Sequence, residues 1–192
     1  MSKLRVYLCR HGETEWTLSG QHTSYSDIPI TPNGELQAQK LKQRLENVDF
    51  TKVYVSPLLR AKMTCEIVGF MQDAEITDDL FEWNYGEVEG KTTPEIRKTI
   101  PGWTIFNDGA PGGESIQQVS DRADRMIEIA RQYEGNVALF SSGHFSRVLA
   151  ARWCGLSASD GRSLALSTAS LSILGYERDV PVIQLWNDTD FL

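Results

Sequence analysis

The sequence has little of what marks a membrane, secreted or nucleic-acid-binding protein. Its longest apolar run is far shorter than the roughly 20 residues of a membrane-spanning helix, and no signal-like apolar segment stands at its amino terminus. The net charge is −7, so no general positive field attracts nucleic acid or anionic lipid. We therefore expect a cytoplasmic protein that binds neither nucleic acid nor membranes. Any anionic substrate must be held by a local cluster of arginines.

Cysteine and histidine are also scarce, with three of each in 192 residues. Cys9, Cys65 and Cys154 cannot all pair, and each stands in an apolar context, so we expect reduced, buried thiols. None has the spacing of a metal or redox motif, and we expect neither a metal nor a cofactor. The length and an ordinary composition, 41% hydrophobic and 23% charged, predict a single domain over residues 1–192.

Strand-like and helix-like segments alternate along the chain. Strands are expected over residues 3–9, 52–56, 75–77, 137–142, 170–176 and 181–186. This order predicts a three-layer α/β/α sandwich with a mostly parallel sheet. Because only a few polar residues join the last two strands, we expect them to form an antiparallel hairpin at one edge.

The helices between these strands have recognisable signals. Thr31-Pro32 is typical of an N-cap followed by the first helical residue, and Ala38, Leu41, Leu45 and Val48 form one apolar stripe behind it. Ser56-Pro57 predicts a second helix start, with Arg60 in the first turn, where free N–H groups favour an anion. Further helices are expected over 114–133 and up to Trp153, before Gly155.

Residues 80–114 fit neither pattern. The segment is rich in Gly, Trp and Pro and is long for a connection. We interpret it as a lid-like excursion over the active site, in which Trp83, Tyr85, Trp103 and Phe106 form the core of the lid rather than a recognition surface.

Two of the three histidines follow strands in the same way. His11 comes after an apolar strand in Arg10-His11-Gly12, and His144 follows another strand in Ser142-Gly143-His144. Open α/β sheets build their ligand sites at the carboxyl ends of such strands. The pair suggests a phosphate site in which one histidine is the nucleophile.

Five motifs in order resemble the histidine phosphatase superfamily, which has the phosphoglycerate-mutase-like fold, and the resemblance covers nearly the whole chain. They are Arg10-His11-Gly12-Glu13-Thr14, Ser56-Pro57-Leu58-Leu59-Arg60-Ala61, Glu82-Trp83-Asn84-Tyr85-Gly86 with Glu89-Gly90, Gly113-Glu114-Ser115, and Ser142-Gly143-His144. The segments 20–23, 81–86 and 103–109 look most like the sedoheptulose-bisphosphatase branch.

The resemblance implies a catalytic set. His11 would attack phosphorus to form a phosphohistidine, and its other ring nitrogen should donate to a backbone carbonyl. Arg10, Arg60 and His144 would clamp the phosphoryl oxygens. Glu82 would donate the proton to the leaving group, which requires a carboxyl of raised pKa. The nearby carboxylates Glu87, Glu89 and Glu114 remain rivals by spacing, although Glu114-Ser115 is more typical of a helix cap.

Five further residues are candidates for substrate contacts: Thr17, Thr23, Ser24, His22 and Arg147. Thr17 stands where many mutase relatives carry an Asn that contacts the phosphate. Arg147 follows His144 by three residues and could share its helix face, within reach of a second phosphate or a sugar hydroxyl.

The expected function is a metal-independent phosphatase for a small phosphate ester, a sugar phosphate or bisphosphate. A cofactor-dependent phosphoglycerate mutase is the first alternative, but only Lys91, Arg97 and Lys98 offer extra cations in the excursion. The second alternative is a binding module for phosphorylated ligands, for which a proton donor such as Glu82 would be unnecessary.

Overall fold

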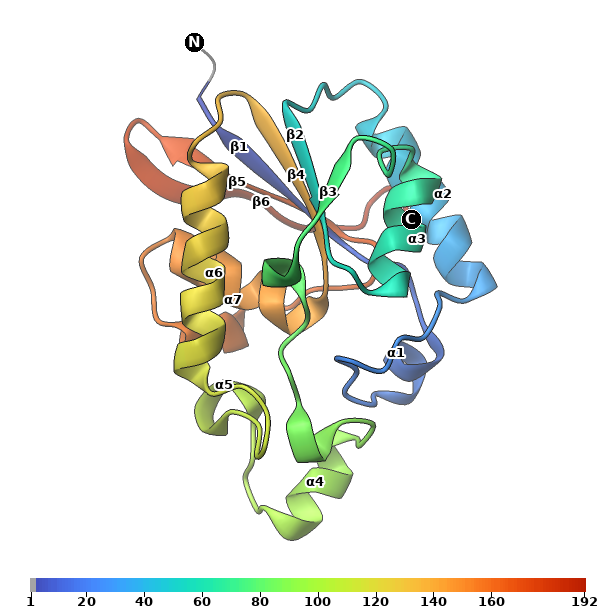
Figure 1. Ribbon diagram of the computed structural model, residues 1–192, viewed down its shortest axis with the longest axis vertical. Coiled ribbons are helices and arrows are strands. Elements are labelled where there is room, and N and C mark those ends of the chain that lie inside the picture. Colours follow the sequence, from blue (N-terminus) through green and yellow to red (C-terminus); the bar gives the residue numbers. More distant parts are fainter. Residues whose placement is uncertain (1–2) are drawn as a thin grey trace.

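One six-stranded sheet organises the molecule, whose computed structural model describes residues 3–192 (Figure 1). The strands are β1 (Arg5–Arg10), β2 (Lys52–Val55), β3 (Ala74–Ile76), β4 (Asn136–Ser141), β5 (Leu171–Glu177) and β6 (Val180–Asp188). Their order is β3-β2-β4-β1-β5-β6, in which the first four are parallel. Strand β5 pairs antiparallel with both β1 and β6, which confirms the predicted hairpin at one edge.

The central strands are apolar on both faces. In β1, Val6 and Leu8 pack into one core cluster, whereas Tyr7 and Cys9 pack into another. Side chains alternate between the two faces of a strand, so such a strand needs cover on both sides. The apolar run predicted from sequence is thus a strand buried between two helical layers.

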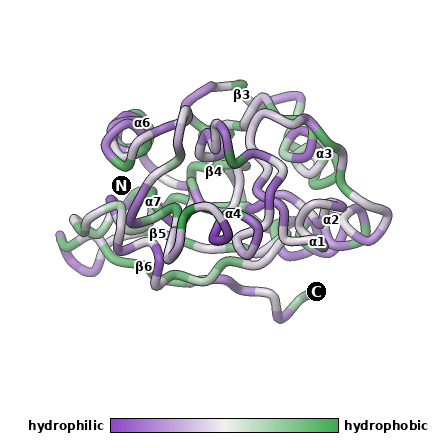
Figure 2. The backbone as a smooth tube through the Cα atoms, turned by 90° about the horizontal axis from the view of Figure 1, so that it is seen from below, coloured by the Kyte–Doolittle hydropathy of each residue, from purple (hydrophilic) through white to green (hydrophobic). Residues whose placement is uncertain are grey.

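Helices cover both faces. The longer ones are α2 (Pro32–Leu45), α3 (Leu59–Val68), α6 (Ile116–Ala130) and α7 (Gly143–Trp153). In the view from below, α2 and α3 lie on one side of the strands and α6 and α7 on the other (Figure 2). This arrangement is the predicted three-layer sandwich. None of the helices within residues 3–192 has the length and apolar character needed to cross a bilayer.

The first two predicted helices differ in detail from those observed, α2 at its end and α3 at its start. Thr31 caps α2 as expected, with its hydroxyl accepting from the Gly34 N–H at 3.0 Å, but Val48 lies beyond the end of the helix. Helix α3 begins at Leu59, later than Ser56-Pro57 suggested, because residues 56–58 form an extended turn that leads into it. Arg60 is nevertheless the second residue of α3, in its first turn.

The cysteines are all free, but they are not all buried. Cys9 and Cys65 are buried between the sheet and α2 and α3, and burial raises the pKa of the Cys65 thiol to about 12. Cys154 is only half-buried, which corrects the prediction. The reason is its position: it follows the last residue of α7, where Gly155 (φ 74°) turns the chain at the surface.

Residues 80–114 are folded rather than loose. They contain a short 3-10 turn (Gly86–Val88) and the helices α4 (Thr93–Thr99) and α5 (Ile105–Asp108), which lie below the sheet in Figure 1. Trp83, Tyr85, Trp103 and Phe106 belong to the same core cluster as the α6 and α7 side of the sheet. The segment is therefore held by the main core.

Candidate active site

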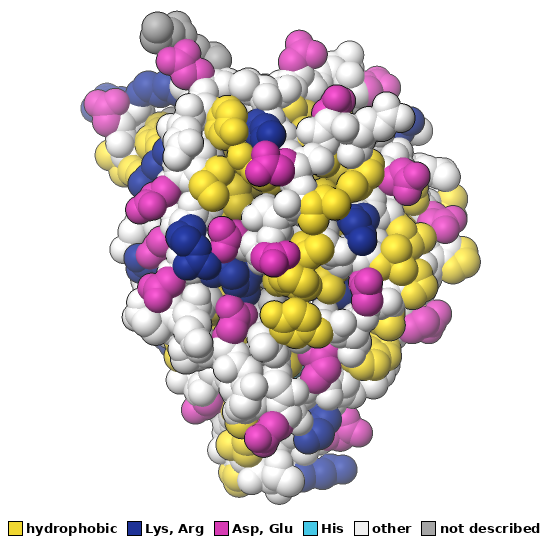
Figure 3. Space-filling view, in the orientation of Figure 1, with side chains coloured by type: hydrophobic (Ala, Val, Ile, Leu, Met, Phe, Trp, Pro, Cys, Tyr) yellow, Lys and Arg dark blue, Asp and Glu magenta, His cyan; other side chains and the backbone are white. Residues whose placement is uncertain are grey.

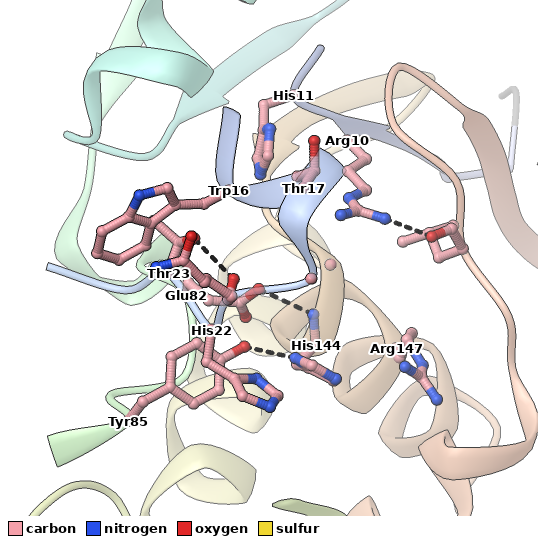
Figure 4. A pocket seen from close by; sticks show the side chains of 14 residues that line it. Arg10, His11, Trp16, Thr17, His22, Thr23, Glu82, Tyr85, His144 and Arg147 are labelled. Atoms are coloured by element: carbon pink, nitrogen blue, oxygen red, sulfur yellow. Dashed lines mark hydrogen bonds between the residues drawn. The ribbon is translucent and has the colours of Figure 1, made fainter. Parts of the chain in front are cut away.

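The two histidine turns lie side by side. Strands β1 and β4 are adjacent and parallel, with Arg10 opposite Ser141, and the His11 N–H donates to the Ser141 carbonyl at 3.0 Å. The turns open onto a cavity of about 180 Å³ at the carboxyl ends of these strands (Figure 4). Its lining includes Arg10, His11, Thr17, His22, Thr23, Glu82, Tyr85, His144 and Arg147.

Gly12 lets the His11 turn pack directly against the start of α2. A Cβ at Gly12 would lie 2.5 Å from the Gly34 carbonyl oxygen, and one at Gly34 would lie 2.4 Å from the Glu13 carbonyl oxygen. Any side chain at either position would force the backbones apart. The paired glycines thus fix the place of His11 relative to α2.

His11 is buried, and its own turn holds one of its ring nitrogens. It is 4% exposed, and its Nδ1 lies 2.8 Å from the Gly12 carbonyl oxygen, to which it donates. Nε2 is then the ring nitrogen with the free electron pair. Burial lowers the pKa of His11 well below 6.5, and the charges of Arg60 and Arg10 lower it further. The ring is therefore neutral at physiological pH.

Two guanidinium groups each have a buried Nε without a partner within residues 3–192. Arg10 donates to the Leu166 carbonyl, and Arg60 donates to the carbonyls of residues 23, 24 and 26 at 3.0–3.2 Å. The Nε of each is buried with no hydrogen-bond partner among residues 3–192. Buried charged donors are rarely left so. An oxyanion bound in the cavity would lie beside Arg10, which lines it. Arg60 itself lies behind the lining of the cavity.

Glu89 holds the loop that positions Arg60. Its carboxylate accepts from the N–H of Ser24 at 2.8 Å, from the N–H of Ser26 at 3.1 Å and from the Ser24 hydroxyl. The carbonyls of this loop in turn receive Arg60. Ser24 belongs to this loop, is buried and does not line the cavity. Sequence spacing gives no signal for this role of Glu89.

Glu82 lies at the amino end of α7. Its Oε1 accepts from the N–H groups of Trp83 at 2.9 Å and Phe145 at 2.7 Å, and its Oε2 accepts from the His144 N–H at 3.0 Å. In Figure 4 it lies between His11 and the contacting pair Tyr85 and His144. Oε1 thus accepts two hydrogen bonds and Oε2 accepts one.

The three rival carboxylates lie outside the cavity. Glu87 is exposed. Glu114 pairs with Arg122 at 2.8 Å, and Arg122 also donates to the Phe81 carbonyl at 2.6 Å, which fixes the backbone beside Glu82. Ser115, not Glu114, caps α6. None of the three rivals lines the cavity.

Tyr85 orients the second histidine. Its hydroxyl contacts Nδ1 of His144. Burial raises the pKa of Tyr85 well above 10.0, and burial together with Arg147 lowers the pKa of His144 well below 6.5. When the Tyr85 hydroxyl donates in this contact, the proton of the neutral His144 ring lies on Nε2. Sequence reasoning assigned Tyr85 only to the lid core, although it stands in the same motif as Glu82.

Four further candidates line the cavity, and they differ in the contacts that their side chains already make. The Thr17 hydroxyl donates to the Thr14 carbonyl at 2.8 Å as part of the capping of α1 (Glu15–Ser19), and the Thr23 hydroxyl donates to the Gln21 carbonyl at 3.1 Å. The single hydrogen of each hydroxyl is therefore already donated to a backbone carbonyl. The His22 Nε2 lies 3.2 Å from the Thr93 hydroxyl, and the Arg147 guanidinium lies 4.4 Å from the Phe106 ring centroid.

The profile of the histidine phosphatase superfamily (branch 1) matches residues 6–189. This chain belongs to that superfamily. An acid phosphatase of Mycobacterium tuberculosis is 39% identical over 180 residues, 92% of this chain and 88% of that protein. The sedoheptulose 1,7-bisphosphatase of Saccharomyces cerevisiae is 37% identical over 185 residues, 79% of this chain and 68% of that protein.

A solved structure supports the fold independently. The product of a Mycobacterium tuberculosis open reading frame superposes with a TM-score of 0.92 at 37% identity, covering 95% of this chain and 96% of that one. The resemblance drawn from the five sequence motifs is thereby confirmed. As a member of this superfamily with phosphatase relatives, the chain is a phosphoric monoester hydrolase by class.

The histidines predict an acid-sensitive fold. Burial lowers the pKa values of His11, His22 and His144. In the unfolded chain these groups take up protons near pH 6.5, whereas in the folded chain they stay neutral, so unfolding binds protons. The free energy of unfolding must therefore fall as the pH drops below 6.5, by up to about 1.4 kcal/mol per pH unit for a group such as His11.

Urea unfolding at pH 7.5, 6.5 and 5.5 measures this effect above the range in which most carboxylates titrate. We expect a His11→Asn variant to show a shallower dependence than the wild type. Equal stability of the wild type at pH 7.5 and pH 5.5 would contradict the neutral, buried state assigned to these rings.

Proposed function

We propose that the protein hydrolyses a small sugar phosphate or sugar bisphosphate through a phosphohistidine at His11. The observation that most supports this proposal is the grouping of the candidate catalytic side chains at one cavity. A neutral, buried imidazole, the Arg10 guanidinium and the Glu82 carboxyl group line this cavity. Arg60 lies behind the lining, and the Nε atoms of Arg10 and Arg60 both lack a partner among residues 3–192.

The first step transfers the phosphoryl group to the enzyme. The Nε2 electron pair of His11 attacks phosphorus while the bond from phosphorus to the ester oxygen breaks. Protonated Glu82 gives its proton to the departing alkoxide. Arg10, Arg60 and the Nε2–H of His144 stabilise the charge on the equatorial oxygens, which is the main demand of phosphoryl transfer.

The second step regenerates the imidazole. Water attacks the phosphohistidine, the phosphorus–nitrogen bond breaks, and the Glu82 carboxylate accepts the proton that the water loses. Inorganic phosphate and the neutral imidazole are the products, and Glu82 is again protonated for the next cycle.

Phosphate release from a panel of sugar phosphates and bisphosphates, in buffer containing EDTA, tests the hydrolysis. Rapid quenching during turnover, followed by peptide mass spectrometry, should find an acid-labile phosphate on His11. Phosphate release with an unlabelled His11 would overturn the mechanism. Isomerisation of 3-phosphoglycerate that depends on bisphosphoglycerate would replace hydrolysis by a mutase activity. Binding of phosphorylated ligands with no phosphate release would favour a binding module.

A further inference from the structure

A second cavity, of about 260 Å³, adjoins the one that contains His11. His22, His144 and Arg147 line both, so a single small molecule can occupy the two together. The second cavity also has Arg97 from α4 and Arg162 from the 3-10 helix Ala158–Ser163 in its wall. No carboxylate lines it.

The three arginines are oriented by neutral groups. The Arg147 Nε donates to the Gly161 carbonyl at 3.1 Å, and its Nη2 donates to the Arg162 carbonyl at 3.0 Å. The Arg97 Nε donates to the Trp103 carbonyl at 2.9 Å, and an Nη of Arg162 donates to the Asn107 side chain at 3.3 Å. These bonds direct the guanidinium groups without neutralising them, because a carbonyl carries no net charge.

None of the three arginines forms an ion pair within residues 3–192. Their positive charges are therefore not balanced by a neighbouring carboxylate at the cavity. Elsewhere acidic and basic side chains are interspersed, as the face in Figure 3 shows. Three like charges around one cavity repel one another, and an anion between them removes that cost.

A neutral donor at the same cavity is also unsatisfied. The Thr104 hydroxyl oxygen is buried with no hydrogen-bond partner among the described residues, and Thr104 lines the second cavity. A hydroxyl and several guanidinium N–H groups around one space form a donor set suited to oxyanions.

We propose that the second cavity binds a second anionic group of the substrate, a phosphate or a carboxylate, while the reacting phosphoryl group lies at His11. This inference rests on the proposed phosphatase function and narrows its substrate class to doubly anionic phosphate esters. Arg97 and Arg162 are its specificity-determining residues, and Arg147 lies between the two cavities.

Matched substrate pairs test the proposal. Fructose 1,6-bisphosphate against fructose 1-phosphate probes a second phosphate, and 3-phosphoglycerate against glycerol 3-phosphate probes a carboxylate. We expect the wild type to favour the doubly anionic member of at least one pair in kcat/KM. The double variant Arg97→Gln/Arg162→Gln should lower kcat/KM for that member by roughly 10- to 100-fold, the range for lost charged hydrogen bonds. It should change kcat/KM for the singly anionic member far less.

Arg5→Gln is the matched control, because it removes one exposed positive charge at the opposite end of β1. This variant should leave kcat/KM unchanged for both substrates of each pair. The proposal is overturned if the wild type shows no preference within either pair, or if the double variant lowers both members equally.

Binding separates failure of the subsite from failure of the proposed function. If no substrate is turned over, calorimetry of fructose 1,6-bisphosphate with the His11→Ala variant still reports on the second cavity. If Arg97→Gln/Arg162→Gln, added to His11→Ala, weakens the binding of fructose 1,6-bisphosphate, the subsite is supported even where the phosphatase proposal has failed. Unchanged binding overturns the subsite as well.

Discussion

Replacing His11 by alanine is expected to lower kcat for phosphate release by a factor on the order of 10⁴ or more, because it removes the atom that accepts the phosphoryl group. The arginines and Glu82 remain, so binding of phosphate esters should survive. The expected result is loss of kcat with little change in dissociation constant. Rapid-mixing measurements of phosphate release, together with calorimetric binding of the same ester, separate the two quantities.

His22→Asn is the matched control for this prediction. His22 is a second histidine lining the same cavity, but its Nε2 contacts the Thr93 hydroxyl and no arginine. Its loss should affect kcat far less than the loss of His11. If the His11→Ala protein, folded by circular dichroism, retained activity near that of the wild type, the phosphohistidine proposal would be wrong.

Glu82→Gln is expected to lower kcat by roughly 10²- to 10⁴-fold for sugar phosphates, the usual contribution of a general acid. The loss should be much smaller for p-nitrophenyl phosphate, whose leaving group departs without protonation. Comparing kcat for the two substrate types measures the role directly, because only proton donation depends on the basicity of the leaving oxygen.

The same substitution has a structural cost that the comparison must separate. Glu82 accepts three backbone N–H groups, and a glutamine offers only one acceptor oxygen, so a buried donor loses its partner at a cost of about 1–3 kcal/mol in unfolding free energy. Exposed Glu87→Gln is the control and should change neither activity nor stability. Equal losses of activity for both leaving groups would mean that Glu82 acts only by holding α7.

Local pattern predicted most of the fold. The β1 run, the Thr31-Pro32 start of α2 and the apolar face of α6 each follow from residues close together in the sequence, and each was found near its predicted limits. The predictions were wrong at the ends of helices. The start of α3 lies at Leu59 because residues 56–58 extend the turn, and Cys154 is half-buried because it stands where a helix ends at the surface.

For the site, the strand-then-turn context of His11 and His144 was enough to place both at one edge of a parallel sheet, since carboxyl ends of adjacent parallel strands coincide. The family motifs pointed to Arg10, Arg60 and Glu82. Ser24 was predicted as a substrate contact, and its spacing does not reveal that it donates to Glu89, far along the chain.

The sequence by itself determined the layered fold, the superfamily and the turn that carries the nucleophile, because periodicity, caps and short motifs are properties of neighbouring residues. Only the tertiary structure decided which groups complete the site. The structure shows three such contacts between segments distant in the chain: Glu89 supports the loop that holds Arg60, Tyr85 contacts His144, and Arg97, Arg147 and Arg162 line one cavity. Such contacts depend on how residues 80–114 pack against α7, and no local pattern encodes that geometry.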